Sequence, residues 1–363
     1  FESLHGDSIN HVELSIVVEK KLGYEPASWE FMTINQLNGL LASGSDNKKP
    51  KSLFSMSSLD MSMWLRVVAI LAVVVTHAGS DLVGRGTLLL SVLVGYNIAR
   101  FKFNDLVNNN SLKTMIPYVM KILVPYYVLA VVFCVWNRAI EWDVLLLYAN
   151  LLEPRITVVF PFLCLQVLVQ CFVVMVVLTS IPLVTQKLKE NPWLSSFVLM
   201  IAFILLRLVY PLFWDTVPLI DQVPTRFIGI LWLGWTAYFS KTIGQKLLVT
   251  AAAISFAYID YGIDQRALWV SLGVPILMFF PTIKLPSIIR MVSIRVAAAT
   301  FYIFIFNGIV IFLFQKIFHV ESIFIGTVVA FVVSIMAWYV LEGAGLMRWV
   351  ISKVIKKNGR VES

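Results

Sequence analysis

The chain has 363 residues, of which 59% are hydrophobic and only 14% are charged. Soluble domains are about half apolar and about one quarter charged, so this composition excludes an ordinary soluble enzyme and indicates a membrane protein. The charge is uneven, because residues 1–41 hold six acidic and two basic residues, a net −4, which leaves +12 for the rest of a chain whose total is +8. An acidic head therefore precedes a basic membrane region.

The three cysteines, Cys134, Cys164 and Cys171, all fall inside apolar runs. They show neither zinc-ligand spacing nor a disulfide framework, so we expect small core residues and no metal site. The first residue is Phe1, and we expect the sequence to be part of a longer chain.

Residues 1–41 contain the signals of two short helices separated by a loop. Asp7-Ser8 is an N-cap pair, and apolar residues follow it up to Leu22. Thr33-Ile34 begins the second helix. The stretch "ASGSDNKKPKS", residues 42–52, is rich in small and polar residues and predicts a flexible linker with a basic end.

Beyond the linker, ten apolar segments are long enough, or nearly long enough, to span a bilayer. We therefore predict an all-α fold, with a ten-span helical bundle over residues 53–350 and a basic tail over residues 351–363. A further run, "WDVLLLYANLL" at 142–152, predicts a short interfacial helix. The ten segments are 61–80, 86–101, 115–136, 156–184, 193–213, 226–240, 243–260, 266–283, 296–316 and 322–345.

The charges between these segments alternate in sign along the chain. Basic residues precede the first segment, follow the second, fourth, sixth and eighth, and recur at the C-terminal end. The alternate loops are short and mostly acidic. Because basic loops stay on the cytoplasmic side, both chain ends are predicted to be cytoplasmic, in what we take to be a bacterial inner membrane.

The acidic head has a second set of features beyond its helix signals. "GDSINHVELSIVVEKKLG" and the following "PASWEFMTINQLNGLL" together resemble the second half of an acyl carrier protein, over residues 4–41. The resemblance implies that Ser8 carries 4′-phosphopantetheine, with Asp7 beside it. A helix N-terminus suits such a phosphodiester, because its free N–H groups and its dipole favour an anion.

Two ionisable residues lie in the first apolar segment, "WLRVVAILAVVVTHAGS". Arg66 and His77 are eleven residues apart, which places them on one face of a helix and about 16 Å apart along its axis. An ionisable side chain inside a span indicates a functional site. The competing interpretations are an arginine that snorkels to the inner headgroups and a histidine at the outer interface.

Several stretches of residues 60–350 resemble acyltransferase family 3, a family of ten-span membrane acyltransferases. The matching residues are Arg66 and His77 for its Arg-x10-His motif, Gly95-Tyr96 for its Ser-Gly-Phe/Tyr turn, and Lys121 with Pro125-Tyr126 for its Arg-x-x-x-Pro-x-Tyr segment.

The match departs from the family pattern at four places, and at one of them Leu88, Leu90 and Ser91 replace the usual Asp-Phe-Phe. Val94 replaces the serine of the turn, Lys121 stands where arginine is usual, and Asn307 occupies a position where a second histidine is common. His77 is then the only histidine within the predicted spans. We therefore expect Val94 and Asn307 to be far less sensitive to substitution than His77.

The two resemblances together imply an enzyme, an O-acyltransferase that transfers groups other than aminoacyl groups. Its donor would be the thioester on Ser8, and its acceptor a hydroxyl or amine that is lipid-linked or extracytoplasmic. Tethering would raise the effective donor concentration to about millimolar, and the acidic head complements the basic inner rim. Expected partners are a phosphopantetheinyl transferase, an adenylating ligase that loads the carrier, the lipid bilayer, and a glycan, lipid or small-molecule acceptor; no nucleic acid is expected.

Within this scheme His77 is the general base and Arg66 organises the donor channel. His77 lies about 22 Å from the inner end of its helix. The phosphopantetheine arm on Ser8 therefore reaches His77 only through a deep inner vestibule. Further candidates for the donor channel or the substrate site are Tyr96, Arg100, Lys121, Tyr126, Gln166 and Asn307, and the cations near the inner ends also include Arg290 and Arg295.

Two alternative functions fit the same sequence. Ten spans with a polar interior also suit an exporter of an acylated small molecule. The membrane region could instead use free acyl-coenzyme A, with the head acting only as a docking module.

Overall fold

The computed structural model describes residues 32–43, 56–80, 86–108, 111–151, 160–213, 223–319 and 322–343, together with Leu14, Val18, Lys21 and Leu22. Its long helices are α3 (Met61–His77), α4 (Thr87–Asn108), α5 (Ser111–Asn137), α7 (Phe160–Ser180), α9 (Pro192–Phe213), α10 (Pro224–Phe239), α11 (Ile243–Tyr261), α12 (Gln265–Phe279), α13 (Ser287–Phe318) and α14 (Ile323–Trp338). The shorter elements are α2 (Ile34–Ser43), β1 (Met56–Asp60), α6 (Trp142–Leu145), η3 (Ala149–Leu151), α8 (Pro182–Glu190), β2 (Thr282–Pro286) and the π-helical η5 (Tyr339–Gly343).

Each of the ten predicted apolar segments overlaps one of these ten long helices. Among the described residues, five helices are long and apolar enough to cross a membrane, which marks the chain as a membrane protein. The ten-span bundle remains a prediction. The five stretches are Met115–Val135, Leu163–Ser180, Pro192–Val209, Ser287–Phe318 and Ile323–Glu342.

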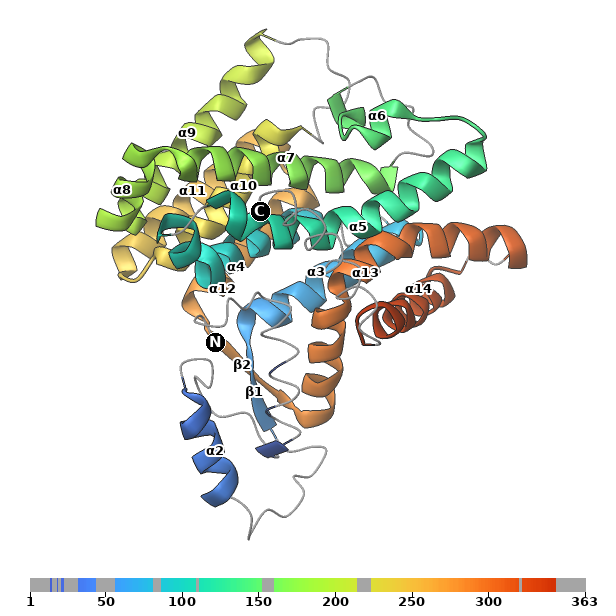
Figure 1. Ribbon diagram of the computed structural model, residues 1–363, viewed down its shortest axis with the longest axis horizontal. Coiled ribbons are helices and arrows are strands. Elements are labelled where there is room, and N and C mark those ends of the chain that lie inside the picture. The colour runs from blue at the N-terminus through green and yellow to red at the C-terminus, as the bar shows by residue number, and fades with distance from the viewer. Residues whose placement is uncertain are drawn as a thin grey trace, which may run out of the picture.

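The structure also contains a two-stranded ribbon that the all-α prediction omitted. β1 pairs antiparallel with β2, so that Asp60 lies opposite Thr282 and Met56 lies opposite Pro286. Helix α3 follows from one end of the ribbon and α13 from the other, and Figure 1 shows the ribbon projecting from the helices with the first turns of α13 running back along it. The buried side chain of Arg290 fixes this arrangement, because its Nε donates to the Ser58 carbonyl oxygen at 2.9 Å.

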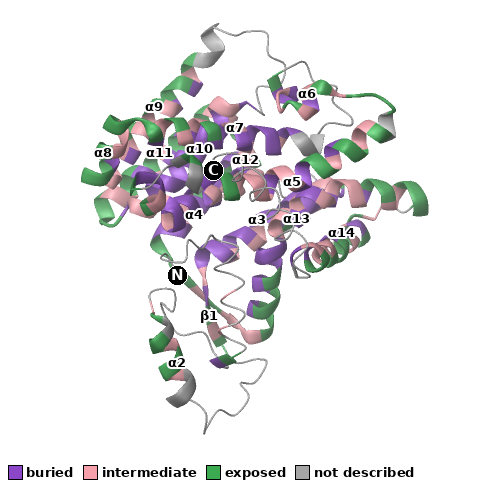
Figure 2. Ribbon diagram, viewed as in Figure 1, coloured by how far each residue is buried: buried purple, intermediate pink, exposed green. Residues whose placement is uncertain are grey.

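The centre of the molecule is the contact between α4 and α10. A Cβ atom on Gly95 would lie 1.8 Å from the Leu231 carbonyl oxygen, and one on Gly234 would lie 1.8 Å from the Val92 carbonyl oxygen. The two backbones therefore touch, which small residues permit in membrane helices. Figure 2 shows buried residues concentrated along α4 and its neighbours. Gly95 and Tyr96, which match the Ser-Gly-Phe/Tyr turn of the resembled family, lie inside α4 and within the predicted apolar segment 86–101.

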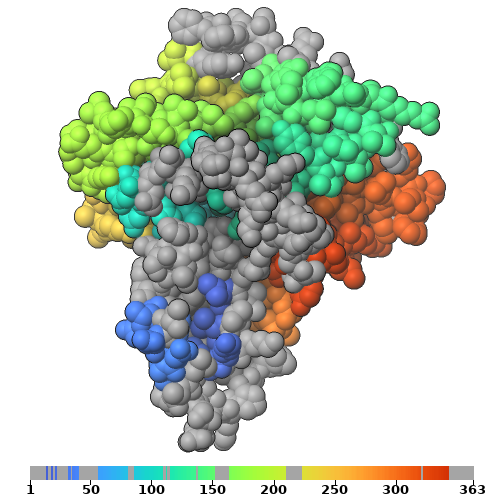
Figure 3. Space-filling view, viewed as in Figure 1, coloured from blue at the N-terminus to red at the C-terminus, as the bar shows by residue number. Residues whose placement is uncertain are grey.

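A second core lies where α3, α13 and α14 pack together. It contains Ile70 and Val74 of α3, Ala299 and Ile303 of α13, and Ala330 of α14, all of them buried. In the space-filling view α13 and α14 form the orange edge of the molecule, opposite the yellow-green α8 and α9 (Figure 3). His77 is the last residue of α3 and lies next to this second core. The packing of α13 against α3 therefore determines the surroundings of the His77 side chain.

The acidic head is described only in part. Leu14, Val18 and Leu22 are helical at i, i+4 and i+8, and Leu22 is buried, as expected of an amphipathic helix. The predicted second helix is α2, and Thr33 opens it with a capping box in which the Gln36 N–H donates to Thr33 Oγ1 and the Thr33 N–H donates to Gln36 Oε1. Helix α2 ends at Ser43, two residues inside the predicted linker. Asp7 and Ser8 lie outside the described residues.

Candidate functional site

His77, the last residue of α3, contacts a single turn of α13. Its Nδ1 forms a very short hydrogen bond with Oδ1 of the buried Asn307. A Cβ atom on Gly308 would lie 4.0 Å from the same Nδ1, so the imidazole packs directly against this turn. The sequence pointed to each residue separately, and the fold joins them across 230 positions of the chain.

The other atoms of Asn307 fix the direction of this hydrogen bond. Its Nδ2 donates to the carbonyl oxygens of Ile303 at 2.7 Å and of Phe304 at 2.8 Å, which are acceptors only. Oδ1 of Asn307 must therefore face His77, and Nδ1 of His77 carries the proton that it donates to Oδ1. In the neutral imidazole, Nε2 is then the nitrogen without a proton.

A cavity lies between α3, α4, α5, α7, α10 and α13, and neither His77 nor Asn307 is part of its wall. Its volume is about 160 Å³, and its wall is largely apolar. The two cations on its wall are Arg66, which is buried on α3, and Lys121, which is half-buried on α5. Asn97 and Ser91 of α4 add polar groups, and Val94, at the position of the missing family serine, is also part of the wall.

One face of α13 connects the cavity with the histidine. Ala297, Phe301 and Phe304 line the cavity, and Gly308 continues the same i, i+4, i+7, i+11 stripe to the contact with His77. The Phe304 carbonyl is also an acceptor for Asn307. Phe304 on the cavity wall and Asn307, the partner of His77, are thus about one helical turn apart on α13.

Arg100 and Tyr96 lie on α4 outside the cavity wall. Arg100 forms a 2.8 Å ion pair with Asp60, whose carboxylate also caps α3 through the Ser62 N–H. Tyr96 packs edge-on against Tyr238, with ring centres 5.4 Å apart, and Lys241 lies over the Tyr238 ring. Partial burial lowers the pKa of Lys241, and the charges of Lys246 and Arg100 add to this effect. These contacts join α4 to the start of α3 and to the end of α10, at the predicted cytoplasmic side.

Tyr126 and Gln166 serve a different segment. Tyr126 donates to the Val144 carbonyl oxygen, and Gln166 Nε2 donates to Tyr126 Oη at 2.7 Å. Gln166 Oε1 in turn accepts from the Asn150 N–H at 3.2 Å. The structure therefore places both predicted donor-channel residues in a clamp that attaches the short helix α6 and η3 to α5 and α7.

The remaining predicted cations near the inner end do not gather at the cavity. Arg290 is committed to the β1 backbone, and Arg295 is exposed on α13. Within the described parts of the chain, no group of three or more His, Cys, Asp and Glu side chains could hold a metal ion.

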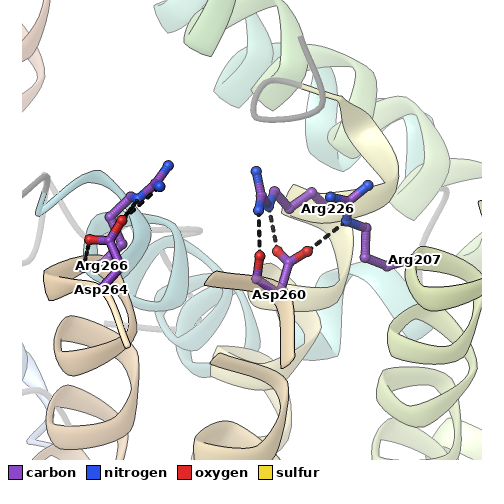
Figure 4. A network of polar contacts seen from close by, with 5 residues as sticks. All are labelled: Arg207, Arg226, Asp260, Asp264 and Arg266. Atoms are coloured by element: carbon purple, nitrogen blue, oxygen red, sulfur yellow. Dashed lines mark hydrogen bonds and ion pairs between the residues drawn. The ribbon is translucent and has the colours of Figure 1, made fainter. Parts of the chain in front are cut away.

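Sequence analysis missed a second buried group of charges. Arg207 of α9 and Arg226 of α10 both bind the carboxylate of Asp260 at the end of α11, and each of the three side chains is no more than 5% exposed. Figure 4 shows the two guanidinium groups converging on this carboxylate, with the Arg266–Asp264 pair alongside. The signal was present, because Arg207 is the lone charged residue of the apolar segment 193–213, just as Arg66 interrupts the first segment.

Comparison of the chain with protein-family models, with curated proteins and with solved structures gave no match. The resemblances to an acyl carrier protein and to acyltransferase family 3 therefore stay predictions.

Proposed function

We propose that this chain is a membrane acyltransferase whose donor is its own carrier segment. It would move an acyl group from a phosphopantetheine thioester on Ser8 to a hydroxyl or amine of a lipid-linked or extracytoplasmic acceptor. The chain would lie in a bacterial inner membrane with ten spans and with both ends in the cytoplasm.

The observation that carries the proposal is the hydrogen bond between His77 and Asn307 beside the cavity. A buried asparagine that fixes one imidazole tautomer has a clear use if Nε2 must accept a proton. A histidine at an ordinary membrane interface has no need of such a partner.

The cavity fits the chemistry of the donor. Its apolar wall suits an acyl chain, and Arg66 and Lys121 suit the phosphate of the arm, because guanidinium and ammonium groups are the usual phosphate partners. When bound, the arm would supply the acyl group as a thioester. Nε2 of His77 would take the proton of the acceptor hydroxyl as its oxygen bonds to the acyl carbon, and that proton would then leave with the sulfur.

The test is single-turnover loss of acyl from the full-length chain in nanodiscs made of host lipid. A phosphopantetheinyl transferase and acyl-coenzyme A of defined chain length would load Ser8 directly, and mass spectrometry of the Ser8 peptide would follow the acyl group. We expect the wild-type chain to lose it to an acylated product and the His77→Ala chain to retain it.

Two variants give this assay its controls. Ser8→Ala should not load at all, whereas Arg66→Gln should load normally and then discharge slowly, because it affects the donor rather than the base. Acyl loss at the wild-type rate from His77→Ala would contradict the assignment of the base. Export of the acyl group across sealed vesicles without any acylated product would favour the exporter instead.

A further inference from the structure

The cavity between α3, α4, α5, α7, α10 and α13 is a space that the fold keeps open. Its volume is about 160 Å³, the room of about five water molecules, whereas few voids inside proteins are larger than one water molecule. The sequence places small residues on its wall, at Ala297 and Ala298 of α13, where leucine or phenylalanine would fill the space. A cavity of this size that the side chains do not close indicates a ligand.

The wall suits an apolar ligand better than ordered water. Two of its hydroxyl groups are used within their own helices, because Ser91 Oγ donates to the Thr87 carbonyl oxygen and Thr300 Oγ1 donates to the Val296 carbonyl oxygen, both at 3.0 Å. A buried water needs roughly two to four polar partners, which a largely apolar wall does not supply throughout a space of this size.

Aromatic rings and branched aliphatic side chains form most of the wall. The rings are those of Tyr118, Phe227, Phe301 and Phe304, and the aliphatic side chains are leucine, valine and isoleucine of α4, α5 and α7. An apolar cavity of about 150 Å³ with leucine, isoleucine and phenylalanine on its wall binds benzene. By this measure the present cavity accepts an apolar group of about six carbons.

The same wall also contains strongly polar groups. Arg66 of α3 is buried, Lys121 of α5 is half-buried, and Asn97 of α4 is buried, and all three line the cavity. Ligand sites are typically apolar with a few polar groups that fix the orientation of the ligand. The wall therefore fits a ligand with a small apolar body and an anionic or strongly polar head.

We infer that the cavity selects a short acyl group, a straight chain of about four to six carbons or a single aromatic ring, and discriminates against a long fatty acyl chain. Each methylene that enters the cavity strengthens binding, and carbons beyond its capacity find no further room in it. The size of the ligand stands on the cavity, whereas its assignment to the acyl group of the donor rests on the proposed function.

The first experiment needs no acyl transfer. Straight-chain carboxylates from acetate to octanoate, and benzoate, are titrated as sodium salts against sodium chloride of equal ionic strength, and the melting temperature of the unloaded full-length protein in zwitterionic nanodiscs is recorded. We expect saturable stabilisation, with binding about two- to fourfold tighter for each added methylene up to hexanoate. Octanoate should bind no more tightly than hexanoate, and benzoate about as tightly as hexanoate.

Two pairs of variants tie this chain-length limit to the cavity. Leu168→Ala removes carbons from the wall and should make octanoate bind more tightly than hexanoate, whereas Leu205→Ala, at a side chain of α9 that is 54% exposed, should behave as the wild type does. Ala298→Leu should weaken the binding of hexanoate about tenfold or more and change that of acetate little. Its control is Ala251→Leu, at an exposed position of α11.

Three results would overturn the inference. They are the absence of saturable stabilisation by any carboxylate, the same gain per methylene from acetate to octanoate in the wild type, which would indicate partition into lipid, and an unchanged chain-length limit in Leu168→Ala. If Ala298→Leu does not fold, Leu168→Ala decides the question, because it removes atoms from a half-buried position instead of adding them to a buried one.

The second experiment tests the assignment to the acyl group. Ser8 is loaded in turn with butyryl, hexanoyl, benzoyl and dodecanoyl groups, and single-turnover discharge is followed in nanodiscs of host lipid. We expect the first three to be transferred at similar rates and dodecanoyl at least about tenfold more slowly. Equal rates for all four would overturn the assignment and leave the acyltransferase in place. If none is transferred, the proposed function fails, and the carboxylate titration still decides the size of the ligand.

Discussion

The α4–α10 contact and the α3–α13 contact both depend on small residues, but they use them in opposite ways. At Gly95 and Gly234 the two backbones touch, and no space remains for even one methyl group. At Ala297, Ala298 and Gly308 the small residues of α13 leave space, which the cavity and the imidazole of His77 occupy. The first contact fixes the position of the bundle helices, and the second places the imidazole of His77 against α13, about one helical turn from the cavity wall at Phe304.

This difference separates the stability of the molecule from its proposed chemistry. Substitutions at the first contact should reduce stability and leave the intrinsic chemistry unchanged. Substitutions at the second should reduce the rate and leave the fold intact. A substitution at the first contact that lowers the intrinsic rate, or one at the second contact that lowers the stability, would show that the two contacts are not independent.

The largest effect is expected at His77. His77→Ala should slow acyl transfer by about 10²–10⁴-fold, or roughly 3–5 kcal/mol of barrier, because Nε2 no longer accepts the acceptor proton. The single-turnover discharge of the Ser8 arm measures the rate, and thermal unfolding in detergent should show little change. A large loss of thermal stability would mean that His77 is chiefly a packing residue of the α3–α13 contact.

The next effect is on stability, at Gly234. In Gly234→Ala the new Cβ would lie 1.8 Å from the Val92 carbonyl oxygen, a backbone atom that cannot move away without separating α4 from α10. We expect a loss of about 3 kcal/mol in the free energy of unfolding, measured by denaturant titration in mixed micelles.

Gly229→Ala, on the same helix, is the matched control for this substitution. Its Cβ would meet Ile204 Cγ1 at 3.8 Å, an ordinary contact, so its stability should stay near the wild-type value. Equal losses in the two variants would indicate a general cost of alanine in α10 and would remove the special role of the α4–α10 contact.

The third effect concerns Asn307, which the sequence predicted to be far less sensitive to substitution than His77. Asn307→Leu should slow transfer roughly 10–100-fold, because nothing then holds the proton on Nδ1 of His77. Asn307→Asp should restore most of the rate, since a carboxylate oxygen also accepts from Nδ1. If both variants are slowed equally, or neither is slowed, Asn307 acts through packing and does not select the tautomer.

The long helices could be predicted from the sequence because a twenty-residue apolar run has few other structures in a membrane. The β1–β2 ribbon could not, because its two five-residue strands are separated by more than 220 residues and neither has a strong strand pattern. The close contact at Gly95 could not be predicted for a related reason. Its lack of a side chain permits the contact with Leu231, which is far away in the sequence.

The residues of the candidate site were predicted one by one, but their arrangement in space was not. Helical periodicity placed Arg66 and His77 on one face of α3, and the fold agrees that one lines the cavity and the other lies one turn of α13 beyond it. The partnership of His77 with Asn307 depends on how α3 packs against α13, which no local pattern specifies. The ion pairs of Asp260, the last residue of the predicted segment 243–260, could not be predicted for the same reason, since its two arginine partners come from other helices.

The smallest effect is expected at Gly308, and it tests the comparison most directly. In Gly308→Ala the new Cβ would lie 4.0 Å from Nδ1 of His77, an ordinary contact, so the change should alter stability by less than about 1 kcal/mol. The same Gly→Ala change at Gly234 should be several times more costly, although both glycines lie inside long helices. Because the methyl group fits beside the imidazole, transfer should stay within a few-fold of the wild-type rate.

A larger substitution, Gly308→Leu, should instead displace His77 and lower the rate without a comparable loss of stability, because the cavity can receive the displaced side chains. If Gly308→Ala destabilises the protein as much as Gly234→Ala, the α3–α13 contact is closed in the same way as the α4–α10 contact, and the space beside His77 is not available to a substrate.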